Sequence, residues 1–315
     1  MPTKKAPRKG SLQFWPRVRA KKDIARVRSW PASTETKISG FAGYKVGMTH
    51  VIATDNKSTS MTKGQDISIP VTILECPPLF VASIVFYKNN LPISAVSASN
   101  FKKQLSKAIS IPKKTKKIEE IKDFDDLRLL VHTQPYLTTI GNKKPRLFEI
   151  PLSGKNEEKL NYAKENLGKE INLSDILAEG QSIDVHSITK GKGMQGPVKR
   201  FGVAIRQHKS EKTKRGPGNL GAWTGARIWR VPQAGQLGYN QRVEYNKWVL
   251  KIGDNLEEIN KSSGYKKYGI IKNQYILVKG SIPGPNKRIV IFTNPLRENK
   301  KIPKEAATIS HISRK

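Results

Sequence analysis

One segment of this chain limits what it can fold into more than any other. Residues 190 to 247 carry many Gly, Pro, Gln and basic residues but only two acids, Glu211 and Glu244. This segment is too long for an ordinary surface loop and has neither helical nor strand periodicity. Strand-like patterns flank it, at Ile183–Thr189, which alternates as a half-buried strand does, and at Trp248–Ile252. The arrangement predicts a β domain from which one long basic finger projects.

The remaining pattern is mainly that of a β protein. Runs at 45–53 and 67–87 are rich in Val, Ile, Thr and Phe, and the pair Pro77-Pro78 predicts a turn between two strands. Residues 156–167 predict a polar helix closed by Gly168, residues 118–124 predict a short helix, and Ser174 is a candidate cap for another that runs to Gly180. The predicted organisation is a basic N-terminal arm (1–39), a β-barrel in parts (40–88, 181–189 and 248–300), an α+β insertion (89–180), the finger (190–247) and a C-terminal tail (301–315).

Charge then restricts the partner. The chain has 58 Lys and Arg against 25 Asp and Glu, a formal net charge of +33, so it repels itself unless an anion neutralises it. The cations lie among Gly, Pro and polar residues without an apolar helical stripe, which favours RNA over a membrane surface. The polar, basic N-terminus predicts no signal segment, and the single Cys76 gives no reason to expect an oxidising compartment, so a cytoplasmic protein is expected.

Motifs for catalysis or cofactors are weak or missing in the sequence. The segment Gly191–Gly196 matches G-x-G-x-x-G, but Pro197 and the residues after it show no helical periodicity, so a nucleotide site is not expected. The five histidines stand far apart, without the spacing of a zinc site. We therefore expect no metal, no cofactor, no small-molecule substrate and no enzymatic activity.

The segment from 208 to 230, HKSEKTKRGPGNLGAWTGARIWR, is the most informative part of the finger. Its lysines and arginines can neutralise phosphates, and Trp223 and Trp229 offer flat faces on which bases stack. Trp223 is alternatively a minor core residue, although its neighbours Gly221, Ala222 and Gly225 build no core around it. Aromatic residues also interrupt the basic arm at Phe14-Trp15, which favours RNA binding over a merely solvated tail.

Seven blocks of sequence, in this order, resemble signatures of one family. They are Gly10–Arg17, Gly43–His50, His132–Gln134, Gly191–Gly196, Gly218–Trp223, Ala234–Arg242 and Lys279–Pro285. The chain is therefore similar to the universal large-subunit ribosomal protein family number three, in its archaeal and eukaryotic form. It departs from eukaryotic relatives at Lys214, where they tend to have histidine after Lys-Thr, so a modified histidine is not expected there.

The resemblance implies a translation-protein type β-barrel bound to large-subunit rRNA, placed early in subunit assembly. It also implies that the finger reaches toward the peptidyl-transferase centre with Trp223 at its tip, and that large-subunit protein fourteen and the archaeal and eukaryotic protein twenty-four are neighbours. A free RNA-binding assembly factor and an RNA-modifying enzyme are the alternatives. The residues expected to bind rRNA are Arg8, Lys9, Arg17, Arg19, Lys190, Lys192, Lys199, Arg200, Arg206, His208, Lys209, Lys212, Lys214, Arg215, Trp223, Arg227, Trp229, Arg230 and Arg242.

Overall fold

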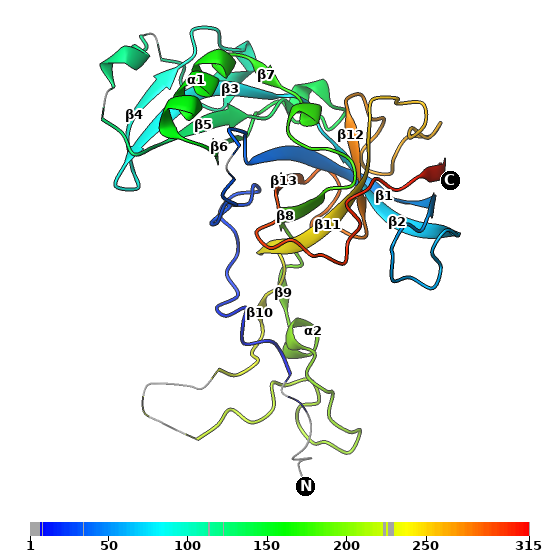
Figure 1. Cartoon of the computed structure of the whole chain (residues 1–315). Helices are drawn as coiled ribbons and strands as arrows, with labels where there is room; N and C mark the ends of the chain where they lie inside the picture. The colour runs from blue at the N-terminus through cyan, green and yellow to red at the C-terminus, as the bar shows by residue number, and fades with distance from the viewer. Residues whose placement is uncertain are drawn as a thin grey trace. The chain divides into compact units, whose positions relative to one another are not determined.

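The fold is that of a computed structural model, which describes residues 7, 9–33, 35–112, 114–121, 123–222, 225 and 230–314. The chain divides into two compact units. The arm–finger unit contains residues 1–23 and 188–242, and the core unit contains residues 24–187 and 243–315. Each unit therefore combines segments that lie far apart in the sequence (Figure 1).

The core unit contains a closed β-barrel, although the ends of two of its strands, at residues 188 and 241–242, fall in the arm–finger unit. Its strands are β1 (Gly40–Thr54), β2 (Asp66–Glu75), β8 (Ser182–Ile188), β11 (Gln241–Gly253), β12 (Tyr275–Lys279) and β13 (Ile289–Thr293). They follow one another in the order β13-β8-β11-β12-β2-β1, and β13 also pairs with β1, which closes the barrel. The last strand, β14 (Ile309–Ile312), pairs with the far half of β1. The predicted mainly β fold is confirmed, with 33% of the described residues in strands and 10% in helices.

The core unit also contains a second antiparallel sheet. It contains β3 (Leu79–Lys88), β4 (Leu91–Ser97), β5 (Asp126–His132), β6 (Leu147–Pro151) and the short β7 (Glu170–Ile171). Helix α1 (Asn156–Asn166) packs against β5. The sequence boundaries assigned β3 to the barrel, but it pairs with β4, β5 and β7 instead. Pro77 and Pro78 separate it from β2, and because proline donates no backbone hydrogen bond, β2 and β3 do not continue as one strand.

A buried carboxylate fixes the point where the chain leaves the barrel for the second sheet. Glu75, at the end of β2, has no exposed surface. Its oxygens accept hydrogen bonds from the Tyr268 hydroxyl, from the backbone N of Lys272 (2.8 Å), and from the backbone N and the Nδ2 of Asn273 (3.0 and 2.7 Å). A buried ion is tolerated only when it is hydrogen bonded. These donors therefore tie the loop that precedes β12 to the end of β2.

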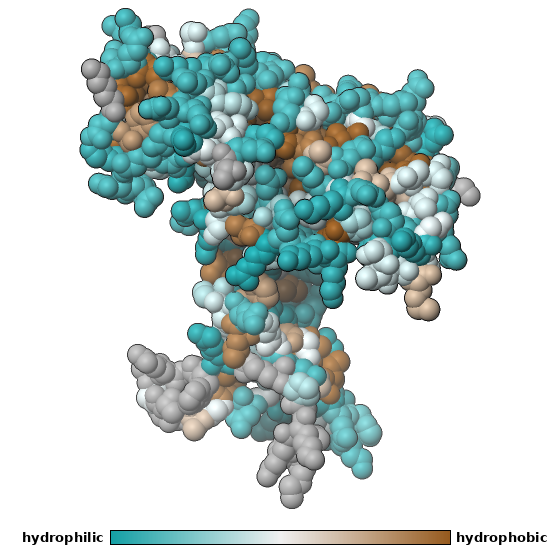
Figure 2. Space-filling view, in the orientation of Figure 1, coloured by the Kyte–Doolittle hydropathy of each residue, from teal (hydrophilic) through white to brown (hydrophobic). Residues whose placement is uncertain are grey.

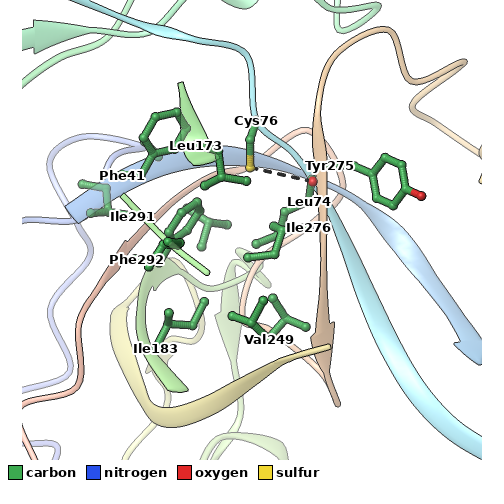
Figure 3. Close-up of a cluster of buried hydrophobic side chains, with 14 of the residues drawn as sticks. Phe41, Leu74, Cys76, Leu173, Ile183, Val249, Tyr275, Ile276, Ile291 and Phe292 are labelled. Atoms are coloured by element: carbon green, nitrogen blue, oxygen red, sulfur yellow. Dashed lines mark hydrogen bonds between the residues drawn. The ribbon is translucent and has the colours of Figure 1, made fainter. Parts of the chain in front are cut away.

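The face of the molecule drawn in Figure 2 is mostly hydrophilic, whereas aliphatic and aromatic side chains from strands that are distant in sequence fill the barrel interior (Figure 3). Phe41 of β1 and Phe292 of β13 lie with ring centroids 5.9 Å apart. The lone cysteine, Cys76, is buried among them, and burial raises the pKa of its thiol well above the ordinary value. The thiol donates a weak hydrogen bond to the Leu74 carbonyl, at 3.8 Å. Cys76 therefore acts as a small core residue.

Individual elements differ from the sequence predictions in instructive ways. The polar helix is confirmed as α1, and Gly168 has a positive φ of 76° beyond its end. The short helix predicted at 118–124 is only a 3-10 turn, η2 (Ile118–Glu120), and Asn172, not Ser174, caps η4 (Leu173–Asp175). Strand β8 was expected to be half-buried, yet Asp184 and His186 on its polar face are buried too. The closed barrel and the segments around it cover both faces.

The arm–finger unit has little regular structure. Strands β9 (Met194–Gln195) and β10 (Gly235–Gln236) pair at the base of the finger, and helix α2 (Pro197–Phe201) follows β9 directly. The expectation that no helix follows the glycine motif is therefore wrong. With 5 residues, α2 is too short to show a periodicity, and it is set by its ends, with Pro197 in its first turn and Gly202 in the left-handed conformation at its C-cap. Helix α2 lies in the sequence between two antiparallel strands, β9 and β10, and not between the parallel strands of a βαβ unit. Its presence therefore does not support a nucleotide site at the glycine motif.

Candidate nucleic-acid interface

The cations predicted to bind RNA are concentrated in the arm–finger unit, where Asp23 and Glu211 are the only acidic residues of the sequence. Most of them are exposed, and Arg17, Arg200 and Arg242 are partly buried. The exposed ones are Lys9, Arg19, Lys190, Lys192, Lys199, Arg206, His208, Lys209, Lys212, Lys214, Arg215 and Arg230. Arg8, Trp223, Arg227 and Trp229 lie outside the described residues. Lysine and arginine side chains that are exposed in this way can reach phosphates without rearrangement of a core.

The N-terminal arm packs against the base of the finger through aromatic rings. Trp15 stacks on Phe201, the last residue of α2, with ring centroids 5.5 Å apart and an interplanar angle of 24°. The guanidinium of Arg17 lies over the same Phe201 ring, 4.1 Å from its centroid. Phe201 is only 7% exposed, and a Cβ atom at Gly10 would collide with its ring at 2.4 Å. Phe201 is thus the residue around which the arm folds.

Hydrogen bonds join the arm to two stretches of the finger, one around Arg200 and one around Tyr239, which we call its two limbs. The backbone N of Ala20 donates to the carbonyl of Tyr239 at 2.8 Å, and Asn240 Nδ2 donates to the carbonyl of Val18 at 2.8 Å. Arg17 Nη1 donates to the carbonyl of Arg200 at 2.7 Å. Two segments more than 180 residues apart therefore form one small structure.

Arg200 links the two limbs of the finger to each other. Its Nε donates to the carbonyl of Gln236 at 3.1 Å, and its Nη1 donates to the carbonyl of Gln233 at 2.9 Å. Its guanidinium lies beside Gly235, where a Cβ atom would come within 2.9 Å of the Arg200 Cζ. Arg200 was predicted as an RNA ligand, and part of its donor capacity serves this internal contact.

The partly buried arginines repel one another. Burial lowers the pKa of Arg17, and the positive charges of Arg200 and Arg242 lower it further. Burial also lowers the pKa of Arg242, whose guanidinium lies over the ring of Phe14 at 4.3 Å. Within the described residues, the Arg17 Nε is buried without a hydrogen-bond partner. Clustered cations of this kind favour an anion such as a phosphodiester close by.

The sequence anticipated the cations of this unit but not the use of its aromatic residues. Phe14 and Trp15 were interpreted as support for RNA binding, whereas in the structure they contact Arg242 and Phe201. Phe201 was not singled out at all. Its signal in the sequence was the run Lys199-Arg-Phe-Gly, an aromatic residue directly before a helix-ending glycine.

Two findings concern metal ions and membranes, both for the described part of the chain. No group of three or more His, Cys, Asp or Glu lies there in a position to hold a metal ion. Nor does that part include a helix long and apolar enough to cross a membrane.

Known proteins similar to this chain place it in a family. The sequence model of the family described as ribosomal protein L3 matches residues 1–98 and 94–313. The chain belongs to the ribosomal protein L3 family. It is 47% identical to the large ribosomal subunit protein uL3 of Methanobrevibacter smithii, over 98% of this chain and 97% of that protein. It is 44% identical to the protein of the same name from Archaeoglobus fulgidus, over 93% of each chain.

Membership confirms the resemblance that the seven sequence blocks carried. The relatives that match this chain over nearly its whole length are named as large-subunit ribosomal proteins. That naming supports a structural role in a ribosome, and it is consistent with RNA as a partner for the basic arm–finger unit.

Proposed function

We propose that this protein is a structural constituent of the large ribosomal subunit that binds large-subunit rRNA through its arm–finger unit and performs no chemistry itself. The observation that carries the proposal is the composition of that unit, which presents 13 exposed lysines and arginines among its described residues, around a small aromatic joint, and has only two acids in its sequence. Lysine and arginine on such a surface neutralise phosphates and release condensed counterions, which supplies most of the affinity of a basic protein for RNA.

The internal contacts of the arm–finger unit support this role. The stack of Trp15 and Phe201 and the hydrogen bond from Ala20 to Tyr239 hold the arm beside the finger. A surface that is partly ordered before binding loses less conformational entropy when it meets RNA. The self-repulsion of Arg17, Arg200 and Arg242 is relieved by the same encounter, so the protein gains stability from its ligand.

Finer assignments follow from the family. We infer an early place in subunit assembly, a cytoplasmic location in the large subunit, and neighbours that include large-subunit protein fourteen and the archaeal and eukaryotic protein twenty-four. The finger reaches toward the peptidyl-transferase centre, with Trp223 at its tip. The support for these inferences is membership in the family together with the sequence Gly218-Asn-Leu-Gly-Ala-Trp223.

The salt dependence of RNA binding tests the electrostatic proposal. The affinity of the full-length protein for large-subunit rRNA is measured from low to high salt, and the logarithm of affinity is plotted against that of salt. Each phosphate contact contributes about 0.7 to 0.9 to the slope. Lys212→Ala lowers the slope by about one such contact, whereas Lys63→Ala, an exposed lysine of the core unit, leaves it unchanged. A nearly flat dependence for the unaltered protein contradicts the proposal.

A pair of variants tests the position of the finger tip. Trp223 carries no charge, so Trp223→Ala leaves the protein in the subunit at normal stoichiometry but changes the chemical reactivity of peptidyl-transferase nucleotides. Arg215→Ala acts differently, because it removes a phosphate contact and weakens docking. Chemical probing of rRNA in purified subunits distinguishes them. Unchanged nucleotides in the Trp223→Ala subunit, or loss of the protein from it, contradict the tip assignment.

A further inference from the structure

A cavity of about 430 Å³ lies in the core unit, far along the chain from every residue predicted to bind RNA. It is bordered by the 3-10 helices η1 (Lys103–Lys107) and η3 (Pro135–Leu137) and by the loop that follows η3. The described residues that line it include no acid, and they are Gln104, Lys107, Pro135, Tyr136, Thr138, Gly141, Asn142 and Lys143. Its volume lies within the range of about 300 to 1,000 Å³ that is usual for ligand sites.

A network of hydrogen bonds anchors Tyr136, the aromatic residue that lines the cavity. The Tyr136 hydroxyl donates to Gln134 Oε1, and the fully buried Gln134 donates through Nε2 to the Pro78 carbonyl (3.0 Å) and to Glu170 Oε1 (2.9 Å). Lys102 Nζ donates to the same Gln134 Oε1 at 2.9 Å. Burial raises the pKa of Tyr136, which keeps its hydroxyl protonated as a donor. The ring is therefore held in place before any ligand arrives.

The two cationic sides of the cavity are also anchored. Leu105, inside η1, has no exposed surface, so it fixes the turn that carries Lys107. On the other side, Thr138 Oγ1 donates to the Pro135 carbonyl at 2.7 Å and closes η3, and Gly141 turns the chain with a φ of 82° before Lys143. Both lysines are themselves exposed. The cavity thus combines a hydrogen-bonded tyrosine with two exposed lysines among its lining residues.

We propose that this cavity binds one unpaired nucleotide of the rRNA, with its base against Tyr136 and its phosphate between Lys107 and Lys143. Sequence-tolerant recognition of single-stranded RNA uses this pair of elements, an aromatic face for the base and cations for the backbone. The amide groups of Gln104 and Asn142 provide donors and acceptors for the edge of the base. The proposal rests on the proposed function and adds to it a second point of RNA contact, in the core unit.

The chemistry of the lining favours RNA over an acidic peptide as the occupant. A peptide carboxylate would satisfy the lysines, but it would leave the fixed ring without a planar partner. The base and phosphate of a nucleotide fit the ring and the cations together.

Crosslinking of the full-length protein to large-subunit rRNA tests the proposal. The complex is irradiated with ultraviolet light, digested, and searched by mass spectrometry for nucleotide adducts on the peptide that contains Tyr136. The expected result is an adduct on residues 135–143 that is lost in Tyr136→Leu and retained in Tyr136→Phe, which keeps the ring. The crosslinked nucleotide then defines a short RNA probe, for which Tyr136→Leu lowers the affinity by about 5- to 150-fold, the range expected for one lost base stack.

Matched lysine variants complete the test. Lys107→Ala lowers the salt-dependence slope by about 0.7, whereas Lys103→Ala, an exposed lysine in the same 3-10 helix that does not line the cavity, leaves it unchanged. If Tyr136→Leu fails to fold, the Tyr136→Phe and Lys107→Ala results still decide. Adducts confined to the arm–finger unit, or a protein crosslinked at residues 135–143, overturn the cavity proposal and leave the proposed function standing. A complete lack of RNA binding overturns both.

Discussion

The joint between the N-terminal arm and the finger allows a quantitative prediction. Phe201→Leu keeps an apolar side chain of similar bulk at the end of α2 but removes the aromatic ring. The ring stacks with Trp15 at 5.5 Å and lies under the guanidinium of Arg17 at 4.1 Å. We expect the arm to open more often in this variant, while the core unit keeps its stability, because none of these contacts belongs to the core unit.

The expected size of the effect follows from the two contacts. An aromatic pair contributes about 0.5 to 1.5 kcal/mol beyond its buried area. A cation over a ring at a partly exposed site contributes about 0.5 to 1 kcal/mol. Their loss lowers the free energy of arm opening by about 1 to 2.5 kcal/mol. Since about 1.4 kcal/mol corresponds to a factor of ten, the open state becomes about 5- to 60-fold more populated.

Hydrogen exchange measures that population directly. The amide of Ala20 is protected when it donates to the Tyr239 carbonyl, and it exchanges when the arm opens. Exchange of peptides that cover residues 18–22 is compared between the unaltered protein and Phe201→Leu, both without RNA. Tyr245→Leu, which replaces an aromatic ring that is 59% exposed on β11, is the control and leaves this exchange unchanged.

Two outcomes refute the reasoning. If Ala20 in the unaltered protein exchanges at the rate of an unstructured peptide, the arm is not docked in the free protein. If it is protected but Phe201→Leu leaves its rate unchanged, the backbone hydrogen bonds alone hold the arm, and the ring contacts contribute nothing measurable.

Three further predictions concern the core unit. Glu75→Ala leaves the buried Tyr268 hydroxyl and the partly buried donors of Lys272 and Asn273 without their acceptor. It lowers the free energy of unfolding by at least about 3 kcal/mol, seen as a melting temperature at least about 6 °C lower, whereas Glu119→Ala on an exposed turn changes it little. Burial lowers the pKa of His132 and of His186 from the ordinary 6.5, so the unfolded chain takes up protons first and stability falls as the pH drops below about 6.5 toward the lowered values. Chemical denaturation between pH 7 and 5 shows this loss, and the double replacement by glutamine makes the dependence shallower; equal slopes contradict the assignment. A protein in which a short Gly-Ser link replaces residues 190–240 still unfolds cooperatively on heating, because β8 ends at Ile188 and β11 begins at Gln241, outside the deleted segment. A broad, non-cooperative transition would show that the finger belongs to the fold.

Local pattern was sufficient for most strands and for the polar helix. The apolar runs that became β2, β3, β12 and β13 are bounded by proline, glycine and asparagine, and such boundaries depend only on residues close in sequence. The sequence pattern did not predict a helix whose extent is set by its terminal residues, or burial that depends on contacts with distant segments. Helix α2 has 5 residues and is defined by Pro197 and Gly202. The polar side chains of β8 are buried because segments distant in sequence cover the outer face of the barrel, where Asp184 accepts hydrogen bonds from the backbone N of Asn246 (2.8 Å) and of Leu296 (2.9 Å).

The sequence by itself determined that this protein carries an excess of cations in two segments, that its ordered part is built from strands, and that it belongs to the ribosomal protein L3 family. These properties are sums over residues or matches of local blocks, so they need no folded chain. Only the tertiary structure decided that β3 leaves the barrel for a second sheet and that Trp15 and Arg17 of the arm close on Phe201 of the finger. It alone placed Lys107 and Tyr136 around one cavity. Each of these arrangements depends on contacts between residues far apart along the chain, and the free energy of such contacts is set by packing, which a linear pattern does not contain.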